Sequence, residues 1–295
     1  MSVRDNSCGI ADLQDKMLDI LKYTIRICDQ NDLTYWVVAG TLLGAVRHGG
    51  FIPWDDDLDI HMPRQDYERL WKLKGKDRTG RYVLCRTTKN RNYHHRVMQM
   101  VDTETTFIHT RCVDEDIEHG VYIDIIPIDI CPENKIAQIA QMFHASLFSI
   151  YNIQCKPEYN GNKAMAVITD IMLRILPNKN LRYKIWKSEE KRMLKYSFDR
   201  KYASSKYLKV ITATMKELKR PFPKEWFGNR KIAFEDIEVN IPSNAEAYLT
   251  AMYGDYMQLP PEEKRVVRHN TIYIDLNTPY KKYKGIYYCK KMMKI

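Results

Sequence analysis

One short segment, GGFIPWDDDLDIHMP (residues 49–63), holds four aspartates within five positions, Asp55, Asp56, Asp57 and Asp59. The residues around them are mostly apolar, so this is not a solvated acidic tail. Two carboxylates about 4 Å apart repel by about 1 kcal/mol in water and by several times that when partly buried. A chain that keeps this charge beside core residues must supply a positive partner, and that requirement constrains both its fold and its chemistry.

The residues DLDIHM (57–62) alternate between polar and apolar, which predicts a strand with one polar face. Because residues i and i+2 of a strand point to the same side, Asp57 and Asp59 should project together, with Leu58 and Ile60 toward the core. Two carboxylates on one rigid face suit a hard divalent cation such as Mg²⁺, which keeps open positions for phosphate oxygens. We therefore predict a metal site that neutralises charge during phosphoryl transfer.

Two other interpretations of the acidic run are a solvated turn without an ion and a calcium-binding EF-hand loop. The apolar flanks and the strand alternation disfavour the first. The aspartate spacing fits the first three ligands of an EF-hand, but Ile60 stands where that loop needs glycine and Asp66 where it needs a bidentate glutamate. The predicted metal site therefore needs a third carboxylate from elsewhere in the chain.

The segment VYIDIIPID supplies one. Asp124 lies in an otherwise apolar predicted strand, and burying a lone aspartate costs several kcal/mol unless it is paired or bound to a metal. If this strand neighbours the acidic strand, Asp124 faces the same ion, whereas the alternative is a carboxylate held by backbone amides. Asp129, which follows the proline, is predicted to cap the next helix.

A glycine turn lies just before the acidic strand, in AGTLLGAVRHGG (39–50). Gly40 and Thr41, at a strand-to-helix turn, can offer backbone N–H groups and a hydroxyl to phosphate oxygens. Arg47 and His48 would then lie close to both the phosphate and the metal. The alternative for both side chains is an ordinary place on the surface.

The rest of the chain alternates between helix and strand signals. Residues 10–30 place apolar or small side chains at spacings of three and four, which predicts an amphipathic helix (Leu13, Met17, Leu21, Thr24 and Cys28). This layout predicts an α+β protein with a small mixed sheet and a helical addition. The other predicted elements are strands at 34–40, 81–87, 96–102 and 120–128, helical turns at 41–50, a helix at 64–74, helices from about 133 to 218 with a break near Pro177-Asn178, a hairpin at 231–242, a short helix at 244–252 and a basic, tyrosine-rich tail.

Charge and cysteine content point to a cytoplasmic protein with anionic partners. The 295 residues carry a net charge of +10, which favours nucleic acid, nucleotides or an anionic membrane surface as partners. The seven cysteines are odd in number and form no CxxC pair, so reduced thiols are expected rather than disulfides or a zinc site. The first residues have no apolar signal-peptide core, and no stretch reaches the ~20 apolar residues of a membrane span.

The segment AGTLLGAVRHGGFIPWDDDLDIHMPRQDYERL resembles the signature of the LicD/fukutin-type phosphotransferases, which belong to the nucleotidyltransferase fold superfamily. Four downstream segments resemble family segments in the expected order, so the likeness spans about residues 10–270: DTETTFI, GVYIDIIPIDICP, PKEWFG and AYLTAMYGDYMQLPPEEKR. This resemblance implies a nucleotidyltransferase-type core over about 1–130, a helical region over 131–218 and a C-terminal segment, 219–295, that returns to the cleft.

By position, the resemblance implies that Asp57, Asp59 and Asp124 are the catalytic and metal-binding carboxylates, with Mg²⁺ or Mn²⁺ as the cofactor. Asp55 and Asp56 belong to the motif without an assigned role. The positions expected to bind substrate are Gly40, Thr41, Arg47, His48, Trp54, Tyr253, Asp255, Tyr256, Arg265 and His269.

Members of this family move a phosphate-linked alcohol from a cytidine diphosphate carrier to a glycan. We therefore expect a CDP-alcohol donor, foremost CDP-choline, and a glycan or lipid-linked glycan acceptor in lipopolysaccharide, teichoic acid or capsule. Choline is a quaternary ammonium that aromatic faces attract, and Trp54, Tyr253 and Tyr256 are candidates for this contact. The net charge favours a peripheral position at the anionic inner face of the cytoplasmic membrane.

Three alternatives stay open at this point. Within the same family, the transferred group could be phosphoribitol or phosphoglycerol. The same fold also serves true nucleotidyl transfer, in which the nucleoside monophosphate stays on the product. A non-enzymatic basic binding protein would not explain three aspartates in apolar strands, so no nucleic-acid partner is expected.

Overall fold

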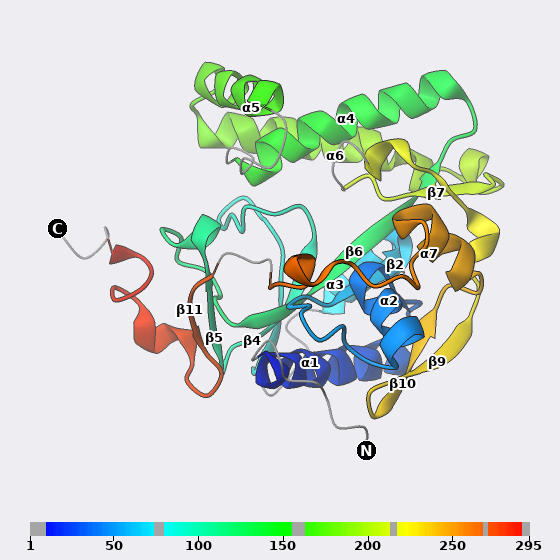
Figure 1. The fold of residues 1–295 in the computed structure, drawn as a ribbon. Coiled ribbons are helices and arrows are strands. Elements are labelled where there is room, and N and C mark those ends of the chain that lie inside the picture. Colours follow the sequence, from blue (N-terminus) through cyan, green and yellow to red (C-terminus); the bar gives the residue numbers. More distant parts are fainter. Residues whose placement is uncertain (1–9, 74–79, 155–162, 213–216, 268–270, 291–295) are drawn as a thin grey trace.

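The computed structural model describes residues 10–73, 80–154, 163–212, 217–267 and 271–290 (Figure 1). Within these ranges, seven strands form a main sheet with the path β1-β2-β6-β4-β3, which β7 and β8 extend from β6. Parallel and antiparallel pairs occur together, which confirms the predicted α+β architecture with a mixed sheet. The strands of this sheet are β1 (Trp36–Val37), β2 (Asp59–Pro63), β3 (Tyr82–Cys85), β4 (Met98–Asp102), β6 (Val121–Cys131), β7 (Tyr207–Lys209) and β8 (Phe222–Pro223).

Strand β6 lies at the centre of this sheet and is longer than predicted. It pairs in parallel with β2 and antiparallel with β4 and β7. Pro127 does not end the strand. It is paired with Met62 of β2, but it lies after the β4 pairing stops, at Ile125, and before the β7 pairing begins, at Asp129. A proline is tolerated at such a position, where its missing N–H removes no ladder hydrogen bond.

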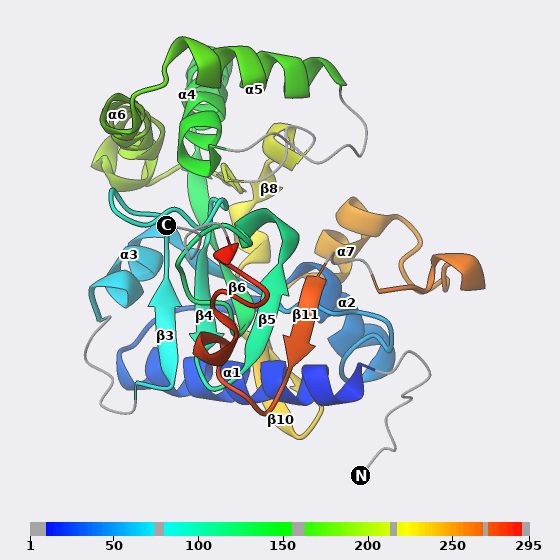
Figure 2. The same ribbon diagram turned by 90° about the vertical axis from the view of Figure 1, so that its left-hand side faces the viewer.

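Three helices pack around the amino-terminal part of the sheet: α1 (Ala11–Gln30), α2 (Ala39–His48) and α3 (Arg64–Leu73). Helix α1 lies across the sheet and contacts β4 and β6 (Figure 2). Its predicted apolar positions are all buried, which confirms the amphipathic pattern. Helix α2 ends at Gly49, whose φ of 72° is the left-handed cap conformation that glycine adopts without strain.

The helical addition consists of α4 (Lys135–Ile153), α5 (Lys163–Ile175) and α6 (Lys179–Phe198), drawn above the sheet in Figure 1. Helices α4 and α6 pack against each other around their own apolar cluster, which includes Phe148 and Trp186. The predicted break near residue 178 is confirmed, because the Asn178 side chain accepts hydrogen bonds from two backbone amides at the start of α6. Strand β7 lies inside the range that was predicted to be helical.

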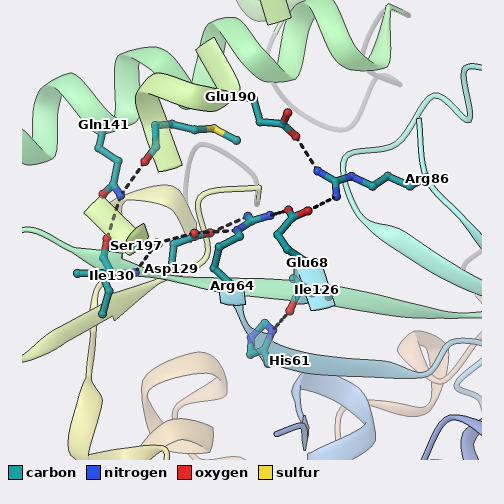
Figure 3. Close-up of polar contacts among 11 residues, drawn as sticks. His61, Arg64, Glu68, Arg86, Ile126, Asp129, Ile130, Gln141, Glu190 and Ser197 are labelled. Atoms are coloured by element: carbon teal, nitrogen blue, oxygen red, sulfur yellow. Dashed lines mark hydrogen bonds and ion pairs between the residues drawn. The ribbon is translucent and has the colours of Figure 1, made fainter. Parts of the chain in front are cut away.

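A buried charge network connects the sheet to this addition (Figure 3). The Arg64 guanidinium of α3 donates two hydrogen bonds, at 2.9 and 2.8 Å, to the Asp129 carboxylate of β6. Ser197 of α6 donates a third to the same carboxylate at 2.8 Å. The prediction that Asp129 caps a helix is therefore wrong, because it lies within β6 and is fully buried. A second chain of ion pairs runs from Glu68 of α3 through Arg86 to Glu190 of α6.

The remaining elements lie at two edges of the core. The predicted hairpin is confirmed as β9 (Arg230–Phe234) and β10 (Ile237–Ile241), and the predicted short helix as α7 (Ala245–Tyr253). The tyrosine-rich tail is more ordered than its sequence suggests. Its β11 (Thr271–Asp275) pairs with the unpredicted β5 (Thr106–His109), and Tyr280 and Tyr288 are buried against Ile108.

None of the described helices combines the length and the apolar character needed to cross a membrane.

Candidate active site

The turn between β1 and α2 forms one wall of the site. Ala39 begins α2 with a φ of 50°, a left-handed conformation that is uncommon for a residue other than glycine. At Gly40 an added Cβ would lie 2.4 Å from Oδ2 of Asp55, so a side chain here would require the Asp55 carboxylate to move. Thr41 is buried and its hydroxyl accepts a hydrogen bond from the Asp59 amide at 2.9 Å. The structure thus places Thr41 behind the acidic strand, where it fixes the start of β2.

The three predicted aspartates come together on one face. Strands β2 and β6 are parallel neighbours, and Asp59 and Asp124 are partners in their register. Asp57 lies two residues before β2 begins at Asp59. The alternation of burial nevertheless extends to it, because Asp57 and Asp59 are half-buried and Leu58 is buried. All three side chains line the same cleft. The expectation that the Asp124 strand neighbours the acidic strand is confirmed.

Asp124 is held in place by a neutral donor. Gln99 of β4 donates from Nε2 to Oδ1 of Asp124 at 2.8 Å, and the two residues are register partners. A neutral amide orients the carboxylate without cancelling its charge. The nearby Tyr122 reflects the negative field of the site: burial, and then the charges of Asp124 and Asp57, raise its pKa well above the ordinary value.

The chemistry of this donor set fits a hard divalent cation, because it offers carboxylate oxygens on one rigid face. In the described parts of the chain, no group of three or more His, Cys, Asp or Glu is arranged to hold a metal by itself. Mg²⁺ is usually bound in proteins by one or two carboxylates together with phosphate oxygens of a substrate.

Most of the predicted substrate positions line a single hollow of about 790 Å³, which we call the C-terminal cleft. It is bounded by the acidic turn, the first residues of α2 and the segment that follows α7. Asp57 and Asp59 lie in its wall. The structure brings together here the predicted residues Gly40, Arg47, Trp54, Tyr253, Asp255, Tyr256 and Arg265.

Contacts among these residues explain how the C-terminal segment is held at the cleft. Arg47 donates to the Tyr256 carbonyl at 2.8 Å. The guanidinium carbon of Arg265 lies 5.6 Å from the centre of the Trp54 ring, a cation–π contact. Partial burial and the neighbouring charge of Arg265 lower the pKa of Arg47. The cleft therefore has one cationic, aromatic wall and one acidic wall.

Besides Thr41, which lies behind the acidic strand, two predicted positions are not in this lining. His48 is exposed and is not part of the cleft lining, although its ring meets the Trp54 ring edge-on at 6.2 Å. Partial burial, and then the charge of Arg47, lower the pKa of His48. His269 lies outside the described residues.

A second hollow, of about 350 Å³, meets the first at the aspartates, and we call it the arginine cleft. Its lining includes Asp57, Asp59 and Asp124 together with five basic side chains that sequence reasoning missed: His94, His95, Arg96, Arg111 and Arg220. The HHR run at 94–96 was a signal that could have been used. No local pattern connects Arg111 and Arg220 to it, since they come from distant segments.

A third hollow, of about 830 Å³, lies between α3 and α6 and is lined by residues such as Trp71, Arg86 and Lys187. None of the described lining residues is among the predicted site positions. The predicted aspartates lie instead in the C-terminal cleft and the arginine cleft.

Comparison with known proteins gives a consistent result. Residues 32–157, which contain the glycine turn and all three aspartates, match the family model described as LicD/FKTN/FKRP, nucleotidyltransferase domain. The chain is 27% identical over 257 residues to lipopolysaccharide cholinephosphotransferase LicD of Haemophilus influenzae, a match that covers 85% of this chain and 92% of that protein.

Two further matches are short. An uncharacterized protein of Rickettsia prowazekii is 48% identical over 57 residues, which is 19% of this chain and 21% of that protein. Ribitol 5-phosphate transferase FKRP of Homo sapiens is 37% identical over 54 residues, which is 18% of this chain and 11% of that protein.

Proposed function

Because residues 32–157 match the family model described as LicD/FKTN/FKRP, nucleotidyltransferase domain, we propose that this chain is a metal-dependent phosphotransferase. It moves a phospho-alcohol from a cytidine diphosphate carrier to a sugar hydroxyl of a cell-envelope glycan, such as lipopolysaccharide, teichoic acid or capsule. The observation that carries the proposal is the register pair Asp59 and Asp124, with Asp57 in the same cleft.

In the proposed reaction, an oxygen–phosphorus bond to the acceptor sugar forms and the bond from that phosphorus to cytidine monophosphate breaks. Asp57 and Asp59 would hold Mg²⁺ or Mn²⁺, which would supply neutralisation of the charge on the phosphate oxygens. Asp124 accepts the proton of the attacking hydroxyl, and Gln99 keeps its carboxylate oriented for that step. Cytidine monophosphate leaves with the displaced oxygen.

The assignment of Asp124 as the base can be separated from its expected role as a third metal ligand. Asp124→Asn should lose turnover in either case, because an amide neither accepts the proton nor replaces a carboxylate on the ion. If Asp124 is the base, Mg²⁺ should still raise the melting temperature of this variant as it does for the wild type. Loss of that stabilisation would instead identify a ligand.

We further propose CDP-choline as the donor and the C-terminal cleft as its site. The long match to a cholinephosphotransferase supports the choline. The face of Trp54 that Arg265 covers is closed to a second cation, because the two charges would repel. Tyr253, which is 44% exposed, is the better aromatic contact for the trimethylammonium.

The test is a panel of donors. The protein is incubated with Mg²⁺, a lipopolysaccharide acceptor and, in turn, CDP-choline, CDP-ribitol or CDP-glycerol, and release of cytidine monophosphate is measured. Turnover with CDP-choline supports the full proposal. Turnover only with CDP-ribitol or CDP-glycerol would overturn the choline assignment. Turnover with CDP-ribitol would favour ribitol 5-phosphate transfer, the activity in the name of the human match.

A matched pair of variants examines the aromatic contact. Tyr253→Ala should raise the KM for CDP-choline by about tenfold, since a cation–π contact contributes about 0.5–2 kcal/mol. Tyr207→Ala, at a tyrosine of similar exposure outside both clefts, should leave it unchanged. An unchanged KM in both variants would remove Tyr253 from the donor site.

We also propose that the protein works in the cytoplasm, close to the anionic inner face of the membrane. The five described cysteines are all free and buried, which supports a reducing compartment. The net charge of +10 supports attraction to anionic lipids that surround a lipid-linked acceptor. Sedimentation with vesicles of anionic but not zwitterionic lipid tests this location.

A further inference from the structure

The arginine cleft has a charge balance that depends on the metal. Three arginines and three aspartates line it, so their formal charges cancel (Arg96, Arg111, Arg220, Asp57, Asp59 and Asp124). A divalent cation held by the aspartates would leave the lining positive. A ligand that enters this cleft in the metal-loaded protein therefore meets a surface that favours an anion.

The arginines reach the cleft from three separate parts of the chain. Arg96 precedes β4, Arg111 follows β5, and Arg220 precedes β8. Arg220 donates to the thioether of Met252 at 3.1 Å, a weak acceptor for a guanidinium. A guanidinium presents several N–H donors in a planar fork that matches two oxygens of a phosphate.

A buried hydroxyl in the same wall points to a polar ligand. Thr212 is 3% exposed and lines the arginine cleft. Its Oγ1 is buried and has no hydrogen-bond partner among the described residues. A buried hydroxyl without a partner is destabilising, and a hydrogen bond to a ligand oxygen would remove that cost.

The position of Asp124 decides which substrate enters here. Asp57 and Asp59 line both clefts, whereas Asp124 lines the arginine cleft and is absent from the described lining of the C-terminal cleft. In phosphoryl transfer the attacking and leaving oxygens lie roughly in line on opposite sides of the phosphorus. Asp124 also lines a smaller hollow of about 150 Å³, which shares His94 and Arg111 with the arginine cleft. We therefore assign the hydroxyl that gives its proton to Asp124 to this side, and the donor to the C-terminal cleft.

We propose that the arginine cleft binds a phosphate group carried by the acceptor, so that the acceptor is a phosphate-bearing sugar rather than a neutral one. This inference rests on the proposed function, because it assigns the two clefts to the two substrates of that reaction. A phosphate monoester carries about −1.5 to −2 charges and three acceptor oxygens. It matches three guanidinium groups and a hydroxyl better than a carboxylate, which has one charge and two oxygens.

Three probes of one sugar separate the possibilities: glucose 6-phosphate, glucuronate and glucose. Binding of each is measured by calorimetry in Mg²⁺, without a donor. The phosphate-bearing sugar should bind at least about tenfold more tightly than either of the others, since hydrogen bonds to a charged group contribute about 1.5–3 kcal/mol each. Equal affinity for glucose and glucose 6-phosphate would overturn the proposal.

Variants then locate the phosphate. Arg220→Met and the isosteric Thr212→Val should each reduce the preference for glucose 6-phosphate while leaving the dissociation constant of CDP-choline unchanged. Arg230→Met removes an arginine that pairs with Glu246 outside the cleft, and it should change neither constant. If the two cleft variants weaken CDP-choline binding instead, the arginines hold the diphosphate of the donor and the acceptor assignment is wrong.

This experiment does not depend on turnover. If no donor is turned over but glucose 6-phosphate still binds more tightly than glucose, only the proposed reaction is contradicted. Turnover of CDP-choline without any preference for that sugar would contradict the acceptor assignment alone. If Arg220→Met does not fold, Thr212→Val still decides the outcome, because valine keeps the shape of threonine.

Discussion

At the scale of single residues, the crowding of negative charge in the acidic turn has a structural explanation. Asp55 lies against the bare Cα of Gly40, and Asp56 is 7% exposed. All four aspartates line the C-terminal cleft, and of these four Asp57 and Asp59 also line the arginine cleft.

Asp57→Asn and Asp59→Asn should each abolish turnover and leave the fold intact, because an amide is a poor ligand for Mg²⁺. A metal that binds only the folded wild type raises its stability by about 2.7 kcal/mol at a concentration 100 times its dissociation constant. Thermal melts with and without Mg²⁺ should show this rise in the wild type and not in either variant. Asp236→Asn, at an exposed ion pair with Lys22, serves as the control and should behave as the wild type. Full turnover by either cleft variant would exclude that aspartate from the site.

Thr41 acts through the strand that it holds. Thr41→Val keeps the shape of the side chain but leaves the Asp59 amide without its acceptor, which should lower the free energy of unfolding by about 1–3 kcal/mol. Turnover should fall as well, because the position of Asp59 is no longer fixed. Denaturant titration of this variant is compared with Thr250→Val, which loses an exposed hydroxyl on α7. Equal stability of the two variants would show that the Thr41 hydrogen bond contributes little.

At the scale of elements, the buried pair of Arg64 and Asp129 joins α3, β6 and α6. Asp129→Asn leaves the Arg64 guanidinium, whose side chain is 3% exposed, without its counter-charge. Removing one partner of a buried pair typically costs about 3–5 kcal/mol, whereas the exposed pair lost in Asp236→Asn contributes about 1 kcal/mol or less. Denaturant titration of the two variants should show this contrast. A loss of similar size in both would mean that the network does not stabilise the contact between the sheet and α6.

Glu68 gives the same junction a pH dependence. Burial opposes ionisation of its carboxyl group, but the charges and hydrogen bonds of Arg86 and Arg64 outweigh burial and lower its pKa below the ordinary 4.5. A group with a lowered pKa in the folded state contributes stability above its unfolded pKa and loses it as the pH falls. The free energy of unfolding should therefore decrease below about pH 4.5, and less steeply in Glu68→Gln than in the wild type. Identical slopes in both proteins would contradict this account.

Sequence patterns predicted the elements whose signals are local. The buried positions of α1, the β9–β10 hairpin, α7 and the alternation around Asp59 all follow from spacings within a few residues. Asp124 was predicted to join Asp59 because a lone carboxylate in an apolar strand needs a partner. The same reasoning did not find the partner of Asp129, since Arg64 is remote in sequence and only the parallel pairing of β2 with β6 brings α3 to that strand.

The unpredicted parts of the fold and of the site depend on long-range pairing. Strand β5 is short, and its strand partner is β11 from the remote tail. The arginine cleft is assembled from residues before β4, after β5 and before β8, which no periodicity connects. The substrate positions of the C-terminal motif were expected from the resemblance and those of the glycine turn from the residues, and most of these expected positions line one cleft.

At the scale of the whole molecule, the two clefts meet at Asp57 and Asp59. We assign the C-terminal cleft to the donor and the arginine cleft to the acceptor. The C-terminal segment completes the donor side through the bond from Arg47 to the Tyr256 carbonyl. The helical addition contributes Ile153 at the end of α4 to the acceptor side. Under this proposal, the phosphocholine group, and not the whole nucleotide, is transferred from donor to acceptor.

Product analysis tests that central claim most directly. The protein is incubated with CDP-choline, Mg²⁺ and a lipopolysaccharide acceptor, and the glycan is analysed by mass spectrometry while the free nucleotide is measured by chromatography. The account predicts phosphocholine on the glycan and cytidine monophosphate released in equal amount, with neither product formed by Asp59→Asn. A glycan that carries the cytidylyl group, or phosphocholine transfer by Asp59→Asn at the rate of the wild type, would contradict it.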